Sequence, residues 1–541
     1  MCGIYAHFGI SKKYDKNQYL SLRGPDDYRE YNGDDYLLAF YRLSIVGLNN
    51  GMQPFDMDGI HLICNGEIYN HKILSDSKEV KSDCESILIS YKKYGIDKTI
   101  RLLDGEFAFV LVDEKKRLVH FARDYMGIKP LYYSKSMNDG KVSKLEVSSL
   151  IKGLSNRNNI EHVKPGYLYT YDMNNKVLSY ERYYSLGLSG IELVDDNELV
   201  YKNIFNKFND AIIKRIQQSE RQVGFLLSGG LDSSLVLSLA LEYLKDKNAK
   251  PMVFTFGYSE DAPDVKSAEI VVEFLREKYG ENSFEWHLVI GGIDESLRRL
   301  PEVIIALETY DTTTIRASTP MYMISEYISK YTNVKVILSG EGSDELFGGY
   351  LYFKYAPNDF AFRSEIKYLL ENLYYYDVLR ADRVTACHGL EVRPPFLDRE
   401  LVEYVLKCPM LCKGKNNTKE LLRDSIRWYE NNYKSVILPN DILFGKKEAF
   451  SDAVGLSWKD AIATMTDSYM KNYEKKYESI KCGHIKPDTN EQKYFQLIFS
   501  VLFGDRIFDI LPSLWLPNQQ WVNTGSEPSA RILDVYSGSK K

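Results

Sequence analysis

Residues 223–234, Val-Gly-Phe-Leu-Leu-Ser-Gly-Gly-Leu-Asp-Ser-Ser, place a short apolar strand directly before a loop that contains two glycines. Gly229 and Gly230 have no side chains, so backbone N–H groups of this loop can approach an anion closely. A helix that follows would add the positive end of its dipole. Because no Gly-Lys-Ser/Thr follows, the loop is not a Walker A loop. The pattern predicts phosphate binding, and the alternative is a plain strand–turn–helix with a capping Ser.

A second loop, residues 339–345, Ser-Gly-Glu-Gly-Ser-Asp-Glu, also follows an apolar strand. It carries the carboxylates Glu341, Asp344 and Glu345, and such crowding is unfavourable unless a cation or a raised pKa relieves it. Asp232 in the first loop would likewise repel a phosphate unless Mg²⁺ lay between them. The two loops therefore predict an ATP site with Mg²⁺ and a proton-transfer group, in preference to solvated surface charge.

The hydrophobic pattern changes along the 541 residues, which are too many for one core. Residues 1–188 contain short strands bounded by Gly, Asp and Asn, which favours stacked antiparallel sheets with helices, an α+β architecture. Residues 198–515 alternate helices with short apolar strands, which predicts a doubly wound parallel α/β sheet with ligands at the carboxyl ends of its strands. Residues 516–541 are polar, and we expect a mobile tail there.

Composition excludes several functional classes. The net charge is −6, the pI is near 5.9 and the basic residues are scattered, so the sequence gives no sign of a basic surface that would bind nucleic acid or an anionic membrane. No apolar run approaches the ~18–20 residues that span a bilayer, and no signal segment opens the chain. The seven Cys are odd in number and have neither disulfide-framework nor metal-pair spacing. These features predict a reduced, cytoplasmic enzyme that acts on small molecules.

Cys2 directly follows the initiator Met1, and removal of Met1 would make it the N-terminal residue. An N-terminal cysteine combines a nucleophile with a base, because an α-amine titrates near pH ~7.7–8.0 and can take the thiol proton. The alternative is a chain terminus without a catalytic role. The two glycine-containing loops favour the first interpretation, an amide-splitting half joined to an ATP-using half.

Other polar residues fit the same chemistry. Arg42 could hold a carboxylate while Asp83 holds an ammonium, which suits a free amino acid substrate. Asn65 and the Gly66 N–H could donate to an oxyanion. The Lys447 ammonium could stabilise negative charge that develops on phosphate. Each pairing has a simpler alternative in a surface salt bridge or a turn, and the sequence does not show whether the groups meet.

The ordered set of motifs resembles the glutamine-hydrolysing asparagine synthetases over nearly the full chain, to about residue 515. The first half is similar to class II glutamine amidotransferases, which are N-terminal-nucleophile hydrolases, through residues 2–4, 23–26, 42–46, 65–70, 82–85 and 123–132. The second half is similar to pyrophosphate-releasing ATP synthetases through residues 228–234, 263–264, 309–320, 339–350, 393–398 and 447–452. This resemblance implies a four-layer N-terminal domain and an ATP-pyrophosphatase-like C-terminal domain.

The resemblance also implies roles for individual residues. The expected catalytic residues are Cys2, Asn65, Gly66, Glu341 and Lys447. The expected glutamine-binding residues are Arg42, Leu43, Ser44, Ile45, Val46, Asn65, Gly66, Glu67 and Asp83. The expected ATP-binding residues are Leu226, Ser228, Gly229, Gly230, Asp232, Ser233, Phe256, Ser339 and Gly340. Aspartate or its activated form is expected at Thr313, Arg316, Glu341 and Asp344, and the metal at Asp232 and Asp344.

The implied reaction converts L-aspartate, ATP, L-glutamine and water to L-asparagine, AMP, diphosphate and L-glutamate. It would use a thioester at Cys2, ammonia transfer between the domains and a β-aspartyl-AMP intermediate, in a homodimer. One alternative is a related amidotransferase, or a β-lactam-synthetase-like enzyme, that acts on another carboxylate. Another is an inactive binding protein with this fold. Leu22 and Ser148-Ser149 depart from the family pattern, but no departure removes a proposed catalytic group.

Overall fold

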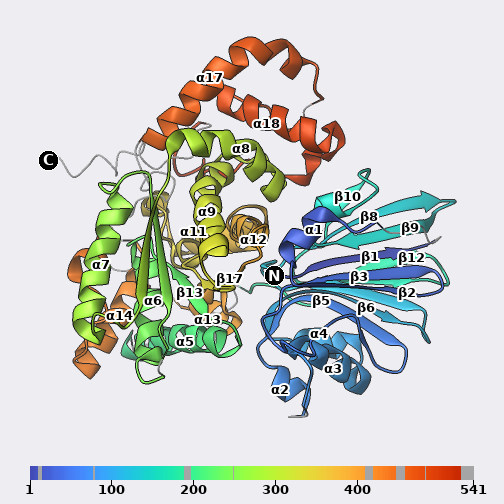
Figure 1. The fold of residues 1–541 in the computed structure, drawn as a ribbon, viewed down its shortest axis with the longest axis horizontal. Helices are drawn as coiled ribbons and strands as arrows, with labels where there is room; N and C mark the ends of the chain where they lie inside the picture. Colours follow the sequence, from blue (N-terminus) through green and yellow to red (C-terminus); the bar gives the residue numbers. More distant parts are fainter. Residues whose placement is uncertain are drawn as a thin grey trace.

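The computed structural model of the chain describes residues 1–9, 15–76, 79–187, 197–247, 249–408, 418–445, 457–481 and 483–525. Figure 1 shows two lobes, one built of stacked sheets and one of helices around a central sheet, with the N-terminus at their junction. None of the helices in the described ranges is long and apolar enough to cross a membrane.

The N-terminal domain contains two antiparallel sheets of six strands each. The first has the order β10-β8-β9-β1-β3-β2 and the second β12-β11-β7-β6-β5-β4. The strands are β1 (Gly3–Phe8), β2 (Asp27–Asn32), β3 (Tyr36–Arg42), β4 (Phe55–Asp56), β5 (Ile60–Ile68), β6 (Gly105–Asp113), β7 (Leu118–Arg123), β8 (Tyr132–Asn138), β9 (Lys141–Ser148), β10 (Ile160–His162), β11 (Tyr167–Asp172) and β12 (Val177–Arg182). The helices are α1 (Gln18–Arg23), α2 (His71–Leu74), α3 (Ser86–Tyr94) and α4 (Ile96–Leu102), with short 3₁₀ turns at Asp83–Glu85 and Ile151–Gly153.

The side chains of β6 explain how the layers form. Ala108 and Val110 point into the core between the two sheets, whereas Phe107 and Phe109 point to the opposite face and pack with α3. This is the two-residue alternation of a strand that is buried on both sides. Leu20 of α1 packs on the outer face of the first sheet. The order helix, sheet, sheet, helix confirms the predicted four-layer α+β architecture.

The second domain contains one parallel sheet with the order β15-β14-β13-β16-β17. Its strands are β13 (Val223–Leu226), β14 (Met252–Gly257), β15 (Glu285–Ile290), β16 (Val336–Leu338) and β17 (Glu391–Arg393). The helices are α5 (Asn197–Gln217), α6 (Leu231–Leu244), α7 (Pro263–Tyr279), α8 (Ile293–Leu307), α9 (Thr312–Tyr331), α10 (Ser343–Phe347), α11 (Asp359–Asn372), α12 (Asp377–Ala386), α13 (Arg399–Val405), α14 (Glu420–Tyr433), α15 (Asn440–Leu443), α17 (Ser457–Glu478) and α18 (Asn490–Phe503). Short 3₁₀ turns lie at Leu351–Tyr355, Leu373–Tyr375, Pro395–Leu397 and Asp505–Ile510.

Helices cover both faces of the parallel sheet. Phe225 and Val253 pack with α5, α6 and α7, whereas Phe254 and Ile337 pack with α8, α9 and α12. This confirms the predicted doubly wound α/β fold. The strands β13 and β16 are neighbours, so the loops that follow them lie side by side at the carboxyl edge of the sheet. The prediction that both glycine-containing loops occupy this edge is confirmed.

The chain after residue 516 differs in part from the expected tail. Residues 516–525 pack on the second domain: Trp521 contacts the rings of Tyr352 and Phe353, and Val522 is buried in the core. The aromatic and aliphatic side chains explain this packing, because burying them removes apolar surface from water. The rest of the expected tail, and most of the segment between the two domains, lies outside the described residues.

Candidate active sites

Cys2 lies directly before β1, beside the end of β3. The Leu43 N–H donates to Cys2 Sγ at 3.4 Å, and the thiol donates to the Leu43 carbonyl at 3.7 Å. Gly3 is needed next to it, since a Cβ at this position would lie 2.8 Å from the Leu20 carbonyl oxygen. The thiol is thus held at the start of residues 43–46, the segment expected to bind glutamine.

Burial controls the ionisation of the N-terminus. It lowers the pKa of the Met1 α-ammonium to about 6, and it raises the pKa of the Cys2 thiol to about 11 although the ammonium and the Leu43 N–H oppose that rise. The Met1 nitrogen lies 3.8 Å from Glu391 Oε2 of the second domain. An amine in these surroundings is largely unprotonated at pH 7 while the thiol keeps its proton. With Met1 in place, transfer of the thiol proton to the amine is therefore uphill, and groups that stabilise the thiolate, such as the Leu43 N–H, would have to assist it.

Asn65 and Gly66 lie in β5 near this thiol. Asn65 is fully buried, and neither polar atom of its side chain has a hydrogen-bond partner among the described residues. Gly66 has φ +147°, and a Cβ there would lie 2.0 Å from the Glu106 carbonyl oxygen, so pairing with β6 requires glycine. An unpartnered buried amide is costly, and here it leaves a donor available for an oxyanion.

The structure brings the segments of Arg42 and Asp83 together around Gly47. Arg42 donates to the Gly47 carbonyl at 2.5 Å, and a Cβ on Gly47 would lie 2.0 Å from the Lys81 carbonyl oxygen. Asp83 accepts the Ile68 N–H at 2.6 Å, and burial raises the pKa of its carboxyl. The Arg42 side chain and the chain just before Asp83 therefore meet at the Gly47 loop.

The expected glutamine-binding segment also contacts the second domain. The Ser44 carbonyl accepts from Arg221 at 2.9 Å, and the Ile45 carbonyl accepts the Glu220 N–H at 3.2 Å. Leu43 and Ile45 are buried in a core that includes α5 and α6, and Val46 packs against it. The segment thus lies at the interface between the domains, which the sequence alone did not indicate.

Glu67 has an unforeseen partner. Its Oε1 lies 3.0 Å from Arg393 Nη2 at the end of β17, and burial raises the pKa of the Glu67 carboxyl although Arg393 lowers it. Glu67 Oε2 has no hydrogen-bond partner among the described residues. Glu67 therefore links the first site to the second domain and keeps one oxygen for a ligand.

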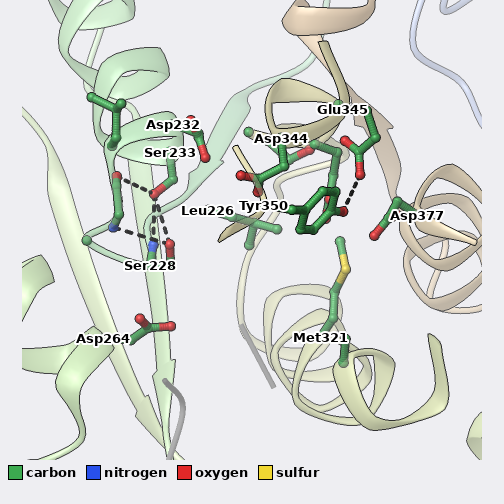
Figure 2. Close-up of a pocket in the computed structure, with 18 of the residues that line it drawn as sticks. Leu226, Ser228, Asp232, Ser233, Asp264, Met321, Asp344, Glu345, Tyr350 and Asp377 are labelled. Atoms are coloured by element: carbon green, nitrogen blue, oxygen red, sulfur yellow. Dashed lines mark hydrogen bonds between the residues drawn. The ribbon is translucent and has the colours of Figure 1, made fainter. Parts of the chain in front are cut away.

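The second candidate site is a cavity of about 520 Å³ at the carboxyl edge of the parallel sheet. Figure 2 shows the serine–glycine loop on one side of it and Asp344, Glu345 and Tyr350 on the other. All of the described residues that the sequence assigned to ATP, aspartate or metal line this one cavity: Leu226, Ser228, Gly229, Gly230, Asp232, Ser233, Phe256, Thr313, Arg316, Ser339, Gly340, Glu341 and Asp344. Lys447, the remaining expected residue of this site, lies outside the described residues.

The loop after β13 is shaped by its own hydroxyl groups. The Ser228 N–H donates to Ser233 Oγ at 3.2 Å, and Ser228 Oγ lies 3.1 Å from the same atom. Gly229 has φ +76°, and a Cβ there would lie 2.3 Å from the Ala268 nitrogen of α7, so glycine is required. The loop leads directly into α6, whose N-terminus faces the cavity. Backbone N–H groups and a helix dipole are thus directed at one point, which favours an anion there.

Lys419 joins the two carboxylates that were expected to bind metal. Its Nζ lies 2.6 Å from Asp232 Oδ2 and 2.8 Å from Asp344 Oδ1, and it donates to Ser343 Oγ at 3.3 Å. The lysine side chain is buried, and its backbone has φ +58° at the start of α14. The sequence does not point to Lys419, because no local motif distinguishes it from a surface lysine.

The Glu341 carboxylate is paired with an arginine. Arg380 of α12 donates to Glu341 Oε2 at 2.7 Å and lies 2.8 Å from Asp377. Burial raises the pKa of Glu341, and Arg380 opposes the rise. The pKa of Glu345 is also raised by burial, and this residue accepts a hydrogen bond from the Tyr350 hydroxyl. The crowded carboxylates are therefore relieved partly by cations and partly by raised pKa values, as expected.

Arg316 and Thr313 differ in availability. Arg316 donates from Nε and from Nη2 to the Glu491 carboxylate of α18, at 2.8 and 2.6 Å. Thr313 Oγ1 is buried and has no partner among the described residues. Arg316 would have to share its guanidinium with Glu491 to hold a ligand, whereas the Thr313 hydroxyl is available.

Comparison with known proteins agrees with this arrangement. A model of the glutamine amidotransferase domain matches residues 1–184, and an asparagine synthase model matches residues 204–366 and 356–481. The chain is 38% identical to the asparagine synthetase [glutamine-hydrolyzing] of Rattus norvegicus and 37% identical to that of Homo sapiens, with 100% of each chain covered. It is 37% identical to a probable asparagine synthetase [glutamine-hydrolyzing] of Acanthamoeba polyphaga mimivirus over 95% of both chains.

Stacked antiparallel sheets with Cys2 at their first strand, joined to a parallel sheet with a glycine-lined cavity, define a glutamine amidotransferase fused to an ATP-using synthetase. The full-length similarity then decides among such enzymes. The chain belongs to the family of glutamine-hydrolysing asparagine synthetases and is a ligase.

Proposed function

We propose that this protein makes L-asparagine from L-aspartate, ATP and L-glutamine, and releases AMP, diphosphate and L-glutamate. The observation that carries the proposal is the cavity in the second domain, which gathers both glycine-containing loops with Thr313, Glu341 and Lys419. A carboxylate resists attack by ammonia because its leaving group is poor. Activation by ATP supplies a better leaving group. Binding of ATP and activation of the aspartate carboxylate both need the groups that line this cavity.

In the first domain, removal of Met1 would free the α-amine of Cys2. The amine takes the thiol proton, and the thiolate attacks the side-chain carbonyl carbon of glutamine. Asn65 and the Gly66 N–H would stabilise the oxyanion, and collapse of this adduct expels ammonia and leaves a thioester on Cys2. Water then releases glutamate and restores the thiol. Arg42, Asp83 and residues 43–46 would hold the amino acid end of glutamine.

In the second domain, the loop after β13 would bind the phosphates of ATP. Asp232 and Asp344 fit a magnesium ion, because Mg²⁺ is typically held by one or two carboxylates together with substrate phosphates. When bound, it would neutralise phosphate charge. Lys419 would remain the protein's own cation beside these carboxylates. Leu226 and Phe256 provide apolar wall for the nucleoside, and Ser339 and Gly340 approach from the neighbouring strand.

Aspartate would be activated through its side-chain carboxylate, which attacks the α-phosphorus of ATP and displaces diphosphate. Ammonia then attacks the β-aspartyl-AMP carbonyl, AMP leaves with its bonding electrons, and the extra proton passes to a nearby base. Glu341 is the proposed base, since it lines the cavity and burial raises the pKa of its carboxyl, which makes the carboxylate a stronger base. Thr313, Arg316 and Lys447 are proposed to hold phosphate or the activated carboxyl.

Ammonia must cross between the domains as neutral NH₃, because bulk water at pH 7 would protonate most of it. A shielded route would preserve the nucleophile. Efficient competition of ammonium from solution with glutamine nitrogen would contradict this route. The resemblance further supports a homodimer in the cytoplasm.

The deciding experiment is product analysis with MgATP, aspartate and glutamine labelled with ¹⁵N at its side-chain amide. Labelled asparagine together with AMP and diphosphate would establish the carboxylate substrate, the activation chemistry and the nitrogen transfer. Release of glutamate without asparagine would instead indicate a relative that acts on another carboxylate. Mass spectrometry of the same sample tests whether Met1 is removed, and its retention would contradict the proposed base.

A further inference from the structure

Arg23, the last residue of α1, connects Cys2 to the second domain. Its Nε donates to the Cys2 carbonyl at 3.1 Å, and its two terminal nitrogens donate to the Asp382 carboxylate at 2.6 and 3.0 Å. Both side chains are fully buried. Burial would raise the pKa of Asp382, but Arg23 lowers it below its ordinary value, so the pair stays charged. A guanidinium held by two parallel bonds has a fixed orientation, and Arg23 therefore ties the Cys2 backbone to α12.

The other end of α12 reaches the synthetase cavity. Asp377 and Arg380 lie in its first turns and line that cavity, and Arg380 donates to Glu341 at 2.7 Å. Asp382 follows Arg380 by two residues in the same ten-residue helix. One short helix thus contacts the proposed catalytic base of one site through Arg380 and, by way of Arg23, the backbone carbonyl of the nucleophilic residue of the other.

We propose that Arg23 and Asp382 are positioning residues through which the occupant of the synthetase cavity sets the placement of Cys2. This inference rests on the proposed function of both sites. A substrate that engages Glu341 or Arg380 changes the contacts that hold the start of α12, and the helix passes this change to Asp382 as one hydrogen-bonded unit. A misplacement of about 1 Å can cost roughly 10²-fold in rate. Glutamine hydrolysis should therefore be fastest when ATP and aspartate are bound, which limits waste of ammonia.

The test needs a variant that weakens this connection without altering either site. Asp382→Asn keeps the shape of the side chain but removes its charge, and it leaves the contact between Arg23 and Cys2 in place. Because a single change to a buried pair can impair folding, the double variant Arg23→Met/Asp382→Leu replaces both charges with apolar groups. Tyr125→Phe is the matched control, since it removes a different hydrogen bond between the domains, from the Tyr125 hydroxyl to the Leu397 carbonyl at 2.7 Å.

Glutamate release is measured with and without ATP and aspartate, beside asparagine synthesis from ammonia. We expect the substrates to raise kcat for glutamine hydrolysis in the unaltered protein and in Tyr125→Phe. In Asp382→Asn this stimulation should fall by roughly threefold to tenfold, the effect of weakening one buried charge-assisted hydrogen bond. The double variant should lose it as well. In Asp382→Asn, which keeps the Arg23 bond to Cys2, the KM for glutamine and the rate of synthesis from ammonia should stay unchanged, and a general loss of structure would not allow this.

Two results would overturn the connection: no stimulation in the unaltered protein, or equal stimulation in Asp382→Asn and the folded double variant. A protein that releases no glutamate under any condition would instead refute the proposed function of the first domain, and the inference with it. A protein that hydrolyses glutamine normally but shows no stimulation would refute the inference alone.

Discussion

Cys2 is the residue on which use of glutamine should depend. Cys2→Ala removes the nucleophile, so glutamine-dependent synthesis should fall by roughly 10³-fold or more, while synthesis from ammonia is retained because the cavity of the second domain is unchanged. Parallel assays with glutamine and with ammonium test this. Equal loss of both activities would contradict two separate sites.

Lys419 should matter for activation of ATP. In Lys419→Met, Asp232 and Asp344 face each other without the ammonium that now lies within 2.8 Å of both. Without this cation the cavity holds the phosphates of ATP less well, so kcat/KM for ATP should fall by roughly 10²-fold, which equals about 3 kcal/mol of transition-state stabilisation. Diphosphate release with ammonia as the nitrogen source measures this effect.

A magnesium titration of Lys419→Met should recover part of the loss, because a bound cation would relieve the same repulsion. Lys266→Met is the matched control, since this lysine of α7 is about half exposed and pairs with Glu269 at the surface. Unchanged ATP kinetics in Lys419→Met would exclude Lys419 from the nucleotide site.

At the scale of single elements, the start of α9 depends on a buried acid. Asp311 caps the helix by accepting from the Thr314 N–H at 2.8 Å, and its other oxygen accepts the Trp515 N–H at 2.7 Å. Burial raises the pKa of Asp311 to about 6 in spite of these hydrogen bonds. In an unfolded chain the pKa of Asp is about 3.9. The protonated carboxyl of Asp311 therefore stabilises the folded protein. This contribution to the free energy of unfolding is fully present below pH ~3.9 and is lost as the pH rises through about 6.

Asp311→Asn should consequently show a pH-dependent stability difference. The substitution loses hydrogen bonds at every pH, but it cannot bury a charge. The difference in free energy of unfolding should thus move in favour of the variant by about 2 kcal/mol between pH 4 and 7. Thermal unfolding of both proteins across this range measures the change, and a constant difference would exclude titration of Asp311.

At the scale of the whole molecule, the interface between the two domains contains a network of buried charged side chains. Arg215 of α5 contacts Glu106 of the first domain at 2.9 Å and Asp398 of the second at 3.0 Å, and Lys129 lies 3.5 Å from the same Glu106. Arg393 continues the network to Glu67. Such groups are costly to separate once buried, so they hold the domains in one relative position.

Arg215→Met should therefore uncouple the domains. It leaves two buried carboxylates with fewer cations, which costs about 3–5 kcal/mol, and we expect calorimetry to show a lower first transition separated from a second. Arg182→Gln breaks a half-exposed ion pair between the domains, to Glu371 at 3.2 Å, and should cost less than about 1 kcal/mol. A single unshifted transition in Arg215→Met would exclude this role for the network.

Local sequence determined much of this protein. The apolar run from Phe107 to Val112, bounded by turn residues, is enough to predict a short strand. Gly229 and Gly340 predict that neighbouring segments approach the backbone closely at these positions, since only glycine has no side chain to fill the space between them. The order of such segments predicted both folds, and the resemblance of the motifs to a known family assigned in advance thirteen of the residues that line the synthetase cavity.

Tertiary structure alone decided which charged groups meet. Lys419 reaches Asp232 across 187 positions, and Arg23 reaches Asp382 across 359. Arg316, expected to face a substrate, lines the cavity and also pairs with Glu491. Periodicity and turn chemistry act over a few residues, whereas an ion pair depends on how whole domains pack. The sequence therefore determined the elements and the loops, and the packing of the two domains determined the partners of their buried charges.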